Sequence, residues 1–344
     1  MSETISGMGP KPGSVRIEAF GGQLSTRLDD WLAVEPDGTI RANSGKVELG
    51  TGVRTALAQI VAEELDVPFE RVHMVMGDTG RTPDEGYTAG SMTILMSGSA
   101  LRKAAAEARR ALLEAAAEAL DAGVEELEIS AGEVFVTQRP ERRASYTALM
   151  GGKRFDREVS GTAPLKPPEG YRVVGRPVPR VDIPAKAAGQ PSFITDVQVP
   201  GMLHARLVRP PGPGAVLESV DESSLAGVPG LVKLVVQGNF IGVIAEREEQ
   251  AVQAARQLKV SWREPAVLPR MEDLYSLMRA QPAEEKVLVE QGDVQAALGQ
   301  SSRRIRAAYL QPYHAHASIG PSCAVADARA EGITVWSSTS GPHP

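Results

Sequence analysis

A glycine-rich turn at residues 45–55 carries the clearest chemical signal in this chain. It reads G-K-V-E-L-G-T-G-V-R-T and lies between an extended run at 39–41 and an amphipathic helix predicted over 56–65. Because Gly50 and Gly52 have no Cβ, their amides can approach a ligand closely, and the helix adds the positive end of its dipole. A phosphate or pyrophosphate is the natural guest. The turn matches neither G-x-G-x-x-G nor a P-loop, and most turns of this kind are only tight turns.

A second turn of small residues follows at 88–93, with the sequence T-A-G-S-M-T. Gly90 and Ser91 offer backbone amides and a hydroxyl group, and a long alanine-rich helix is predicted directly after them, over 98–122. Taken alone, such a turn is most often just the start of a helix. Two such turns on neighbouring loops can nevertheless face one extended ligand.

Other residues with chemical potential lack the neighbours that a site needs. His314 and His316 would share one face of a strand, but no further ligand residue lies beside them, so a structural or channel-lining role is favoured. The spacing of Asp78, Asp84 and Glu85 matches no calcium loop. We therefore assign no metal site, and no serine lies in the G-x-S-x-G context of a nucleophile elbow.

Composition restricts the class of protein. Of the 344 residues, 42% are apolar and 23% charged, which is typical of a soluble globular chain of two or three domains. A net charge of -6 without a basic stripe argues against nucleic acid or an anionic membrane as partner. Cys323 is the single cysteine, which excludes an internal disulfide and an all-cysteine cluster. With neither a signal peptide nor a spanning segment apparent, we predict a cytoplasmic protein.

The elements that would position these residues indicate an α+β, partly α/β, multidomain chain. Residues 1–25, rich in Gly, Pro and Ser, are predicted to be a flexible lead-in. The unit at 26–160 contains two strands joined by an Asp-Gly turn, the glycine-rich turn and its helix, a further strand, the second turn and its helix, and a hairpin near 128–136. Three prolines at 161–168 indicate a linker.

A second α+β unit is predicted over 170–263, because valine-rich alternating runs surround one helical stretch. Its strands are predicted at 171–174, 193–197, 202–208, 228–236, 241–245 and 259–262, and its helix at 248–258. Beyond it, a charged, loop-rich stretch precedes strands predicted at 305–310, 323–328 and 333–338. A strand so close to Pro344 is typical of a truncated domain or of one completed by another chain.

Together, these motifs resemble the molybdopterin-binding large subunits of the xanthine dehydrogenase and aldehyde oxidase family. The shared motifs are K-V-E-L-G-T-G-V-R-T from Lys46, A-E-E-L from Ala62, G-D-T from Gly77, T-A-G-S from Thr88, P-Y-H-A-H-A from Pro312 and V-W-S-S-T from Val335. The first group precedes residues 170–263, which resemble the family's hammerhead domain. This order is similar to that of the isoquinoline 1-oxidoreductase and nicotinate dehydrogenase branch.

The resemblance implies that 26–160 is an N-terminal molybdopterin-binding segment and that 300–344 begins a further, incomplete molybdopterin-binding domain. It also implies that the two turns hold the pterin and phosphate of a molybdopterin cytosine dinucleotide. Carried over, these cofactor-binding roles fall on Leu49, Gly50, Thr51, Gly52, Ala89, Gly90, Ser91, Met92 and Ser340. The family commonly has glutamine where Thr51 and Ser340 stand, and at the latter position that glutamine reaches an oxo ligand of molybdenum.

The implied reaction is hydroxylation of a ring carbon in an N-heteroaromatic compound, or of an aldehyde, with water as the oxygen source. Electrons would leave through [2Fe-2S] clusters, which one cysteine cannot hold, so an iron–sulfur small subunit is an expected partner. The family's general-base glutamate is expected in a C-terminal part of the large subunit outside this chain. No catalytic residue is therefore assigned, and we expect the chain alone to be inactive.

Two alternatives stay open on the sequence. The chain could be a catalytically inactive assembly or binding module of that family. It could also be an unrelated α/β nucleotide-binding protein, which would bind ATP or NAD.

Overall fold

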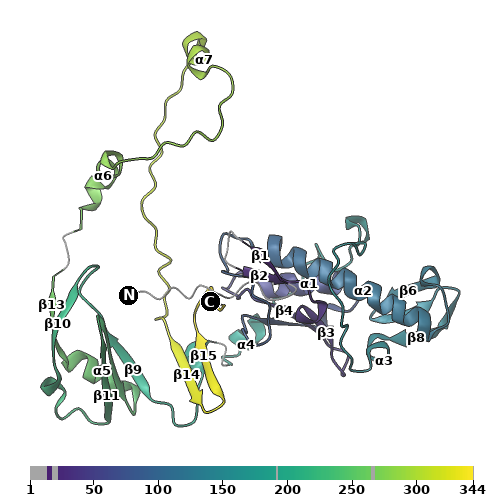
Figure 1. Ribbon diagram of the computed structural model, residues 1–344, viewed down its shortest axis with the longest axis horizontal. Coiled ribbons are helices and arrows are strands. Elements are labelled where there is room, and N and C mark those ends of the chain that lie inside the picture. The colour runs from purple at the N-terminus through teal and green to yellow at the C-terminus, as the bar shows by residue number, and fades with distance from the viewer. Residues whose placement is uncertain (1–13, 18–21, 191–192, 265–267, 344) are drawn as a thin grey trace. The chain divides into compact units, whose positions relative to one another are not determined.

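A computed structural model describes residues 14–17, 22–190, 193–264 and 268–343 (Figure 1). The chain divides into two compact units, of which the first comprises residues 1–197 and 322–344 and the second residues 198–321. Both units contain helices and strands, in agreement with the predicted mixture of α and β structure.

The first unit is built on a three-stranded sheet that carries both turns on one edge. Strand β3 (Leu32–Val34) pairs antiparallel with β4 (Ile40–Ser44), which pairs parallel with β5 (Val72–Met76). Helix α1 (Val53–Leu65) forms the crossover between the parallel strands, so the predicted strand, turn, helix and strand are confirmed. Because β4 and β5 are parallel, the loops that follow them leave from the same edge of the sheet.

Helix α2 (Ser99–Ala119) packs against α1 through small side chains. Ala104, Ala105 and Ala108 are fully buried, which allows the close approach that the alanine-rich sequence predicts. The helix is entered through a π-helical turn at Ile94–Gly98. A three-stranded antiparallel sheet and a short helix complete this part: β6 (Leu127–Ser130), β7 (Glu133–Val136), β8 (Arg139–Ser145) and α3 (Tyr146–Met150).

Residues 157–174, which we call the strap, run over α1 and α2 and depend on carboxylates from these helices. One oxygen of Glu63 accepts the amides of residues 172–174, at 2.8, 2.6 and 3.0 Å. Glu64 pairs with two arginines of α2 and accepts the amide of Lys166, while Glu107 accepts the amide and hydroxyl of Ser160. The predicted linker at 161–168 is therefore tied to the first unit.

Several predicted elements differ from the structure. The predicted strand at 171–174 is wrong, because its amides converge on one carboxylate instead of forming a ladder. The predicted strand at 193–197 is replaced by a 3-10 turn at Ile194–Asp196. Within the predicted lead-in, β1 (Ser14–Ile17) and β2 (Gly22–Ser25) form an antiparallel pair; the other residues up to 21 lie outside the described ones.

The second unit has a three-stranded antiparallel sheet in the order β11-β12-β9 and a separate strand pair, β10-β13. The sheet, the strand pair and helix α5 share one hydrophobic core. Its buried residues are Leu225, Val228, Ile241, Val243, Ala254 and Leu258. The elements are β9 (His204–Val208), β10 (Val216–Asp221), β11 (Leu231–Gln237), β12 (Phe240–Ala245), α5 (Glu248–Gln257) and β13 (Lys259–Arg263). The compact division falls at residue 197, whereas the sequence predicts the start of this domain at 170.

The remaining residues contain two short helices and one hairpin. Helices α6 (Leu274–Ala280) and α7 (Val294–Gln300) lie in the predicted loop-rich stretch. The predicted strand at 305–310 is wrong, since residues 301–321 contain neither helix nor strand. The last two predicted strands are confirmed as β14 (Ala324–Arg329) and β15 (Gly332–Ser337), which pair antiparallel and belong to the first unit.

Candidate functional site

A buried network joins the start of the first turn to the loop that precedes the second. One carboxylate oxygen of Glu85 accepts the hydroxyl of Ser44 at 2.6 Å and the amide of Gly45 at 2.8 Å. The ammonium group of Lys46 donates to the carbonyls of Glu85 and Tyr87, at 2.5 and 2.6 Å. Burial lowers the pKa of Lys46, although the nearby carboxylates of Glu85 and Asp84 oppose this shift. The two turns are thus held in one fixed relation.

Thr88 connects three segments to which the family resemblance assigns one site. Its hydroxyl accepts the amide of Val47 at 2.9 Å, and its own amide donates to the carbonyl of Ser340 at 2.7 Å. Gly341 lies directly against the ring of Tyr87, where an added Cβ would be 2.5 Å from ring atoms. The structure therefore brings Ser340 beside the second turn, and its carbonyl oxygen makes the contact.

The first turn projects into solvent. Leu49 is 58% exposed, and Gly50 and Thr51 are also exposed. Gly50 and Gly52 have φ values of 91° and 82°, a region that strongly favours glycine. An exposed backbone with left-handed glycines is what close approach of a ligand requires.

The amides at the start of α1, which were predicted to hold the anionic group of a ligand, already bind a carboxylate of the protein itself. The carboxylate of Glu48 accepts the amides of Gly52 and Arg54 at 2.9 and 3.0 Å, and so caps α1 from within the turn. Burial opposes ionisation of Glu48, but the amides of Arg54, Gly52 and Gly50 outweigh it, and its pKa is lowered. The prediction that the end of α1 is open to phosphate is corrected: Glu48 already takes amides at this end, and the backbone of the turn that is exposed to solvent lies at 49–51.

Arg180 also lies at the first turn, and sequence reasoning missed it. Its guanidinium donates to the carbonyl of Gly50 at 2.8 Å and pairs with both oxygens of Asp182, at 3.0 and 2.7 Å. These bonds, together with Lys186 in α4 (Ile183–Ala187), hold the pKa of Asp182 well below its usual range. No local pattern points to this contact, because 130 residues separate Arg180 from Gly50.

The second turn differs in leaving its amides open. Gly90 and Ser91 have φ values of 62° and 57°, and residues 89–91 are exposed. Among the residues that the structure describes, no acceptor faces the amides of Ala89, Gly90 and Ser91, whereas the amide of Met92 bonds back to Ala89. Successive backbone amides in a turn conformation can form an anion-binding concavity. This turn fits a phosphate better than the first.

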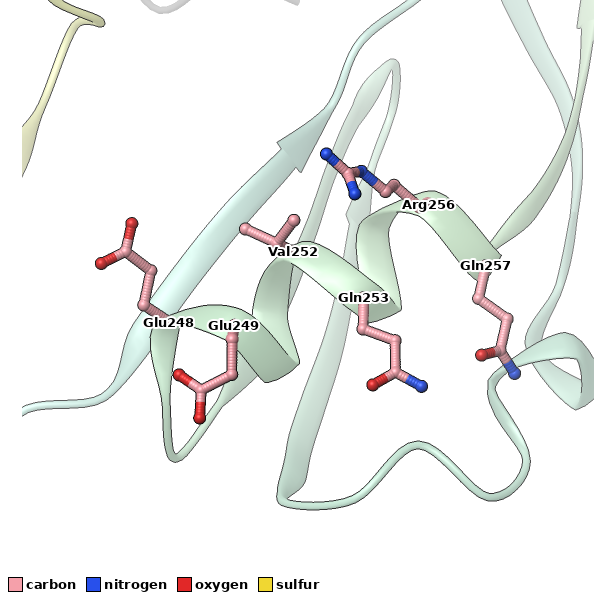
Figure 2. A pocket seen from close by; sticks show the side chains of 6 residues that line it. All are labelled: Glu248, Glu249, Val252, Gln253, Arg256 and Gln257. Carbon is pink, nitrogen blue, oxygen red and sulfur yellow. The ribbon is translucent and has the colours of Figure 1, made fainter.

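The structure has two hollows of similar volume, and only one of them adjoins the first turn. The first, of about 710 Å³, lies along the outer face of α5, and Figure 2 shows that all six lining side chains come from this one helix. It is a surface hollow of the second unit, without convergent chemistry. The second, of about 700 Å³, lies between the first turn, β5 and α4, and its lining includes Glu48, Arg54, His73, Asp182 and Lys186.

Two negative observations concern the described residues alone. None of them form a group of three or more His, Cys, Asp or Glu side chains able to hold a metal ion. In the same part of the chain, no helix is both long enough and apolar enough to cross a membrane.

Comparison with known proteins identifies the family of the chain. Residues 7–174 match the family model for a molybdopterin cofactor-binding domain. The chain is 47% identical to a nicotinate dehydrogenase component of Pseudomonas putida, over 91% of the chain and 27% of that protein. It is 31% identical to the beta subunit of isoquinoline 1-oxidoreductase from Brevundimonas diminuta, over 68% of this chain and 35% of that protein.

A solved structure, quinoline 2-oxidoreductase from Pseudomonas putida 86, is 26% identical over 35% of this chain and 15% of its own, with a TM-score of 0.32. The chain spans only 27% and 35% of the lengths of the nicotinate dehydrogenase and isoquinoline 1-oxidoreductase relatives. The alternative of an unrelated nucleotide-binding protein is excluded by the match at residues 7–174 and by the 47% identity. The chain belongs to the xanthine oxidase family of molybdopterin-binding proteins.

Proposed function

We propose that this chain is part of the large subunit of a molybdenum hydroxylase that acts on an N-heteroaromatic ring or an aldehyde. The proposal is supported by the family membership and by the names of the relatives, nicotinate dehydrogenase and isoquinoline 1-oxidoreductase. An iron–sulfur small subunit would accept the electrons, because this chain has a single cysteine. The hammerhead role of residues 170–263, the further molybdopterin-binding role of 300–344 and a cytoplasmic location are parts of the same proposal.

Within this chain, the two turns would hold a molybdopterin cytosine dinucleotide. The open amides of Ala89, Gly90 and Ser91 suit a phosphate group. The exposed backbone at Leu49, Gly50 and Thr51 suits close approach by a second part of the ligand, with Gly52 and Met92 closing the two turns. When bound, the cofactor would supply the oxidation chemistry, with water as the oxygen source.

The observation that carries the proposal is the convergence at Thr88. Segments around residues 47, 88 and 340 are far apart in sequence, yet two hydrogen bonds of Thr88 join them. These are the segments that bear the family's motifs. A common ligand explains why they lie together.

Cofactor analysis tests the proposal. The full chain, co-expressed with its iron–sulfur partner in a host that makes molybdopterin dinucleotides, should release a cytosine nucleotide and molybdopterin on denaturation. Mass spectrometry of the released compounds identifies both. Protein that is folded and paired but carries no dinucleotide would contradict the proposal.

A catalytically inactive binding module of the same family is the second candidate, because no residue of this chain is assigned a catalytic role. Both candidates predict no turnover by the chain alone. They differ in the assembled complex, where a hydroxylase converts a heteroaromatic substrate and a module leaves it unchanged although the dinucleotide is bound.

A further inference from the structure

The first turn lacks the packing that ordinarily fixes a ligand-binding loop. Its side chains project into solvent, and glycine loses more conformational freedom on folding than any other residue. Glu48 restrains the turn from one side through backbone amides. The carbonyl of Gly50 needs a restraint of its own.

Arg180 supplies this second restraint. Its guanidinium donates to the Gly50 carbonyl, and its aliphatic stem covers Gly52, whose added Cβ would lie 3.4 Å from the Arg180 Cδ. The adjacent amide of Val181 donates to the hydroxyl of Thr55 at 3.1 Å, which anchors the same segment to the first turn of α1. The contact is therefore part of a docked segment.

Asp182 determines which donor of Arg180 is left for the turn. Its two oxygens engage Nε and Nη2 in a fork, so that Nη1 points to Gly50. Lys186 bonds to the same carboxylate at 2.7 Å and fixes it from α4. A lysine in place of Arg180 could not make the fork and the carbonyl bond together.

We propose that Arg180, oriented by Asp182, is a positioning residue of the cofactor-binding turn and holds Leu49, Gly50 and Thr51 in the shape that receives the dinucleotide. The inference rests on the proposed function. It adds to the site a cationic residue, Arg180, that lies outside both turns.

The first test uses the free chain and needs no cofactor. In Arg180→Gln, hydrogen–deuterium exchange of a peptide covering residues 49–54 should rise about tenfold, the effect of losing one charge-assisted hydrogen bond. Exchange at residues 88–93 should stay unchanged. The control is Arg270→Gln, which removes an ion pair between residues two positions apart, Arg270 and Glu272 at 2.6 Å, outside the segments that are assigned a binding role. Unchanged exchange at 49–54 would overturn the inference.

The second test measures retention of the dinucleotide by the cofactor-loaded complex. Arg180→Gln should lose the dinucleotide about tenfold faster than wild type, Arg180→Lys should fall between them, and Arg270→Gln should match wild type. If wild type is loaded and Arg180→Gln retains the cofactor equally well, the inference fails while the proposed function stands. If folded wild type carries no dinucleotide, the proposed function fails and this role of Arg180 fails with it.

Discussion

The two turns of the first unit look alike in sequence but use their backbone amides differently. In the first, the carboxylate of Glu48 occupies the amides at the start of α1, and Arg180 holds a carbonyl. In the second, three consecutive amides at 89–91 have no acceptor among the described residues. The difference shows that glycines and a following helix do not by themselves make an anion site. What matters is whether the protein already satisfies the donors.

The largest effect is expected where the two turns are joined. In Gly45→Ala, the new Cβ would lie 2.1 Å from the carbonyl oxygen of Pro83, a backbone atom that cannot turn aside. We expect the free energy of unfolding to fall by about 3 kcal/mol, as in severe overpacking. Urea denaturation measures it. The control is Gly80→Ala, in the loop that contains Pro83, where the new Cβ would meet only the Asp78 side chain at 3.4 Å. Equal stability of both variants would refute a rigid junction.

A valine at the second turn should damage ligand binding more than folding. Gly90→Val forces a β-branched residue to a φ of 62°, at a cost of about 1–2 kcal/mol, and alters the open amides. The dinucleotide content of the purified complex should drop sharply. Ala89→Val adds similar bulk at an exposed residue without a left-handed φ and should retain more cofactor. Equal retention by both variants would show that the second turn does not bind the ligand.

The internal cap of the first turn should respond to pH. Because the folded-state pKa of Glu48 is lowered, its contribution is present above the unfolded pKa of about 4.3 and is lost as the pH falls through the folded value. Glu48→Gln should therefore cost about 1 kcal/mol at pH 7 and less and less below pH 4. Urea denaturation across this range tests it, with the exposed Glu128→Gln as control. A cost independent of pH would contradict the ionised cap.

The smallest effect is expected at Ser340. Its backbone carbonyl makes the bond to Thr88, so Ser340→Ala should change the free energy of unfolding by less than about 0.5 kcal/mol. Thr88→Val, which removes the hydroxyl that accepts the Val47 amide, should cost more. Thermal denaturation of the two variants compares them. A large loss in Ser340→Ala would assign its side chain a structural role.

Local patterns predicted the elements that present the site. Hydrophobic alternation and helical spacing located β4, α1, β5 and α2, because these elements bury one face each and the period shows in the sequence. Glycines marked both turns, because positive φ values need them. The proximity of Ser340 to the second turn came from the family resemblance, and no pattern in the residues contained it.

Long-range polar contacts could not be predicted in the same way. A valine pair at 173–174 looks like a strand by composition, but its amides bind Glu63, which lies more than a hundred residues earlier. Arg180 reaches Gly50 across a similar separation. Glu48 is a different case, since it precedes Gly52 by only four residues. The usual capping signal is a Ser, Thr, Asp or Asn at the N-cap position, which here is Gly52, so the rule does not point to Glu48.

The strap over α1 and α2 has a practical consequence for protease sensitivity. By composition, residues 161–168 look like an unprotected connection, yet Lys166 and its neighbours are bonded to Glu64, Arg102 and Arg109. Cleavage requires a segment to leave its partners and enter an enzyme's active site in extended form. The strap should therefore resist nicking at neutral pH. It should become cleavable in acid, where protonation of Glu63, whose pKa is lowered by the amides it accepts against the effect of its burial, weakens the attachment of residues 172–174.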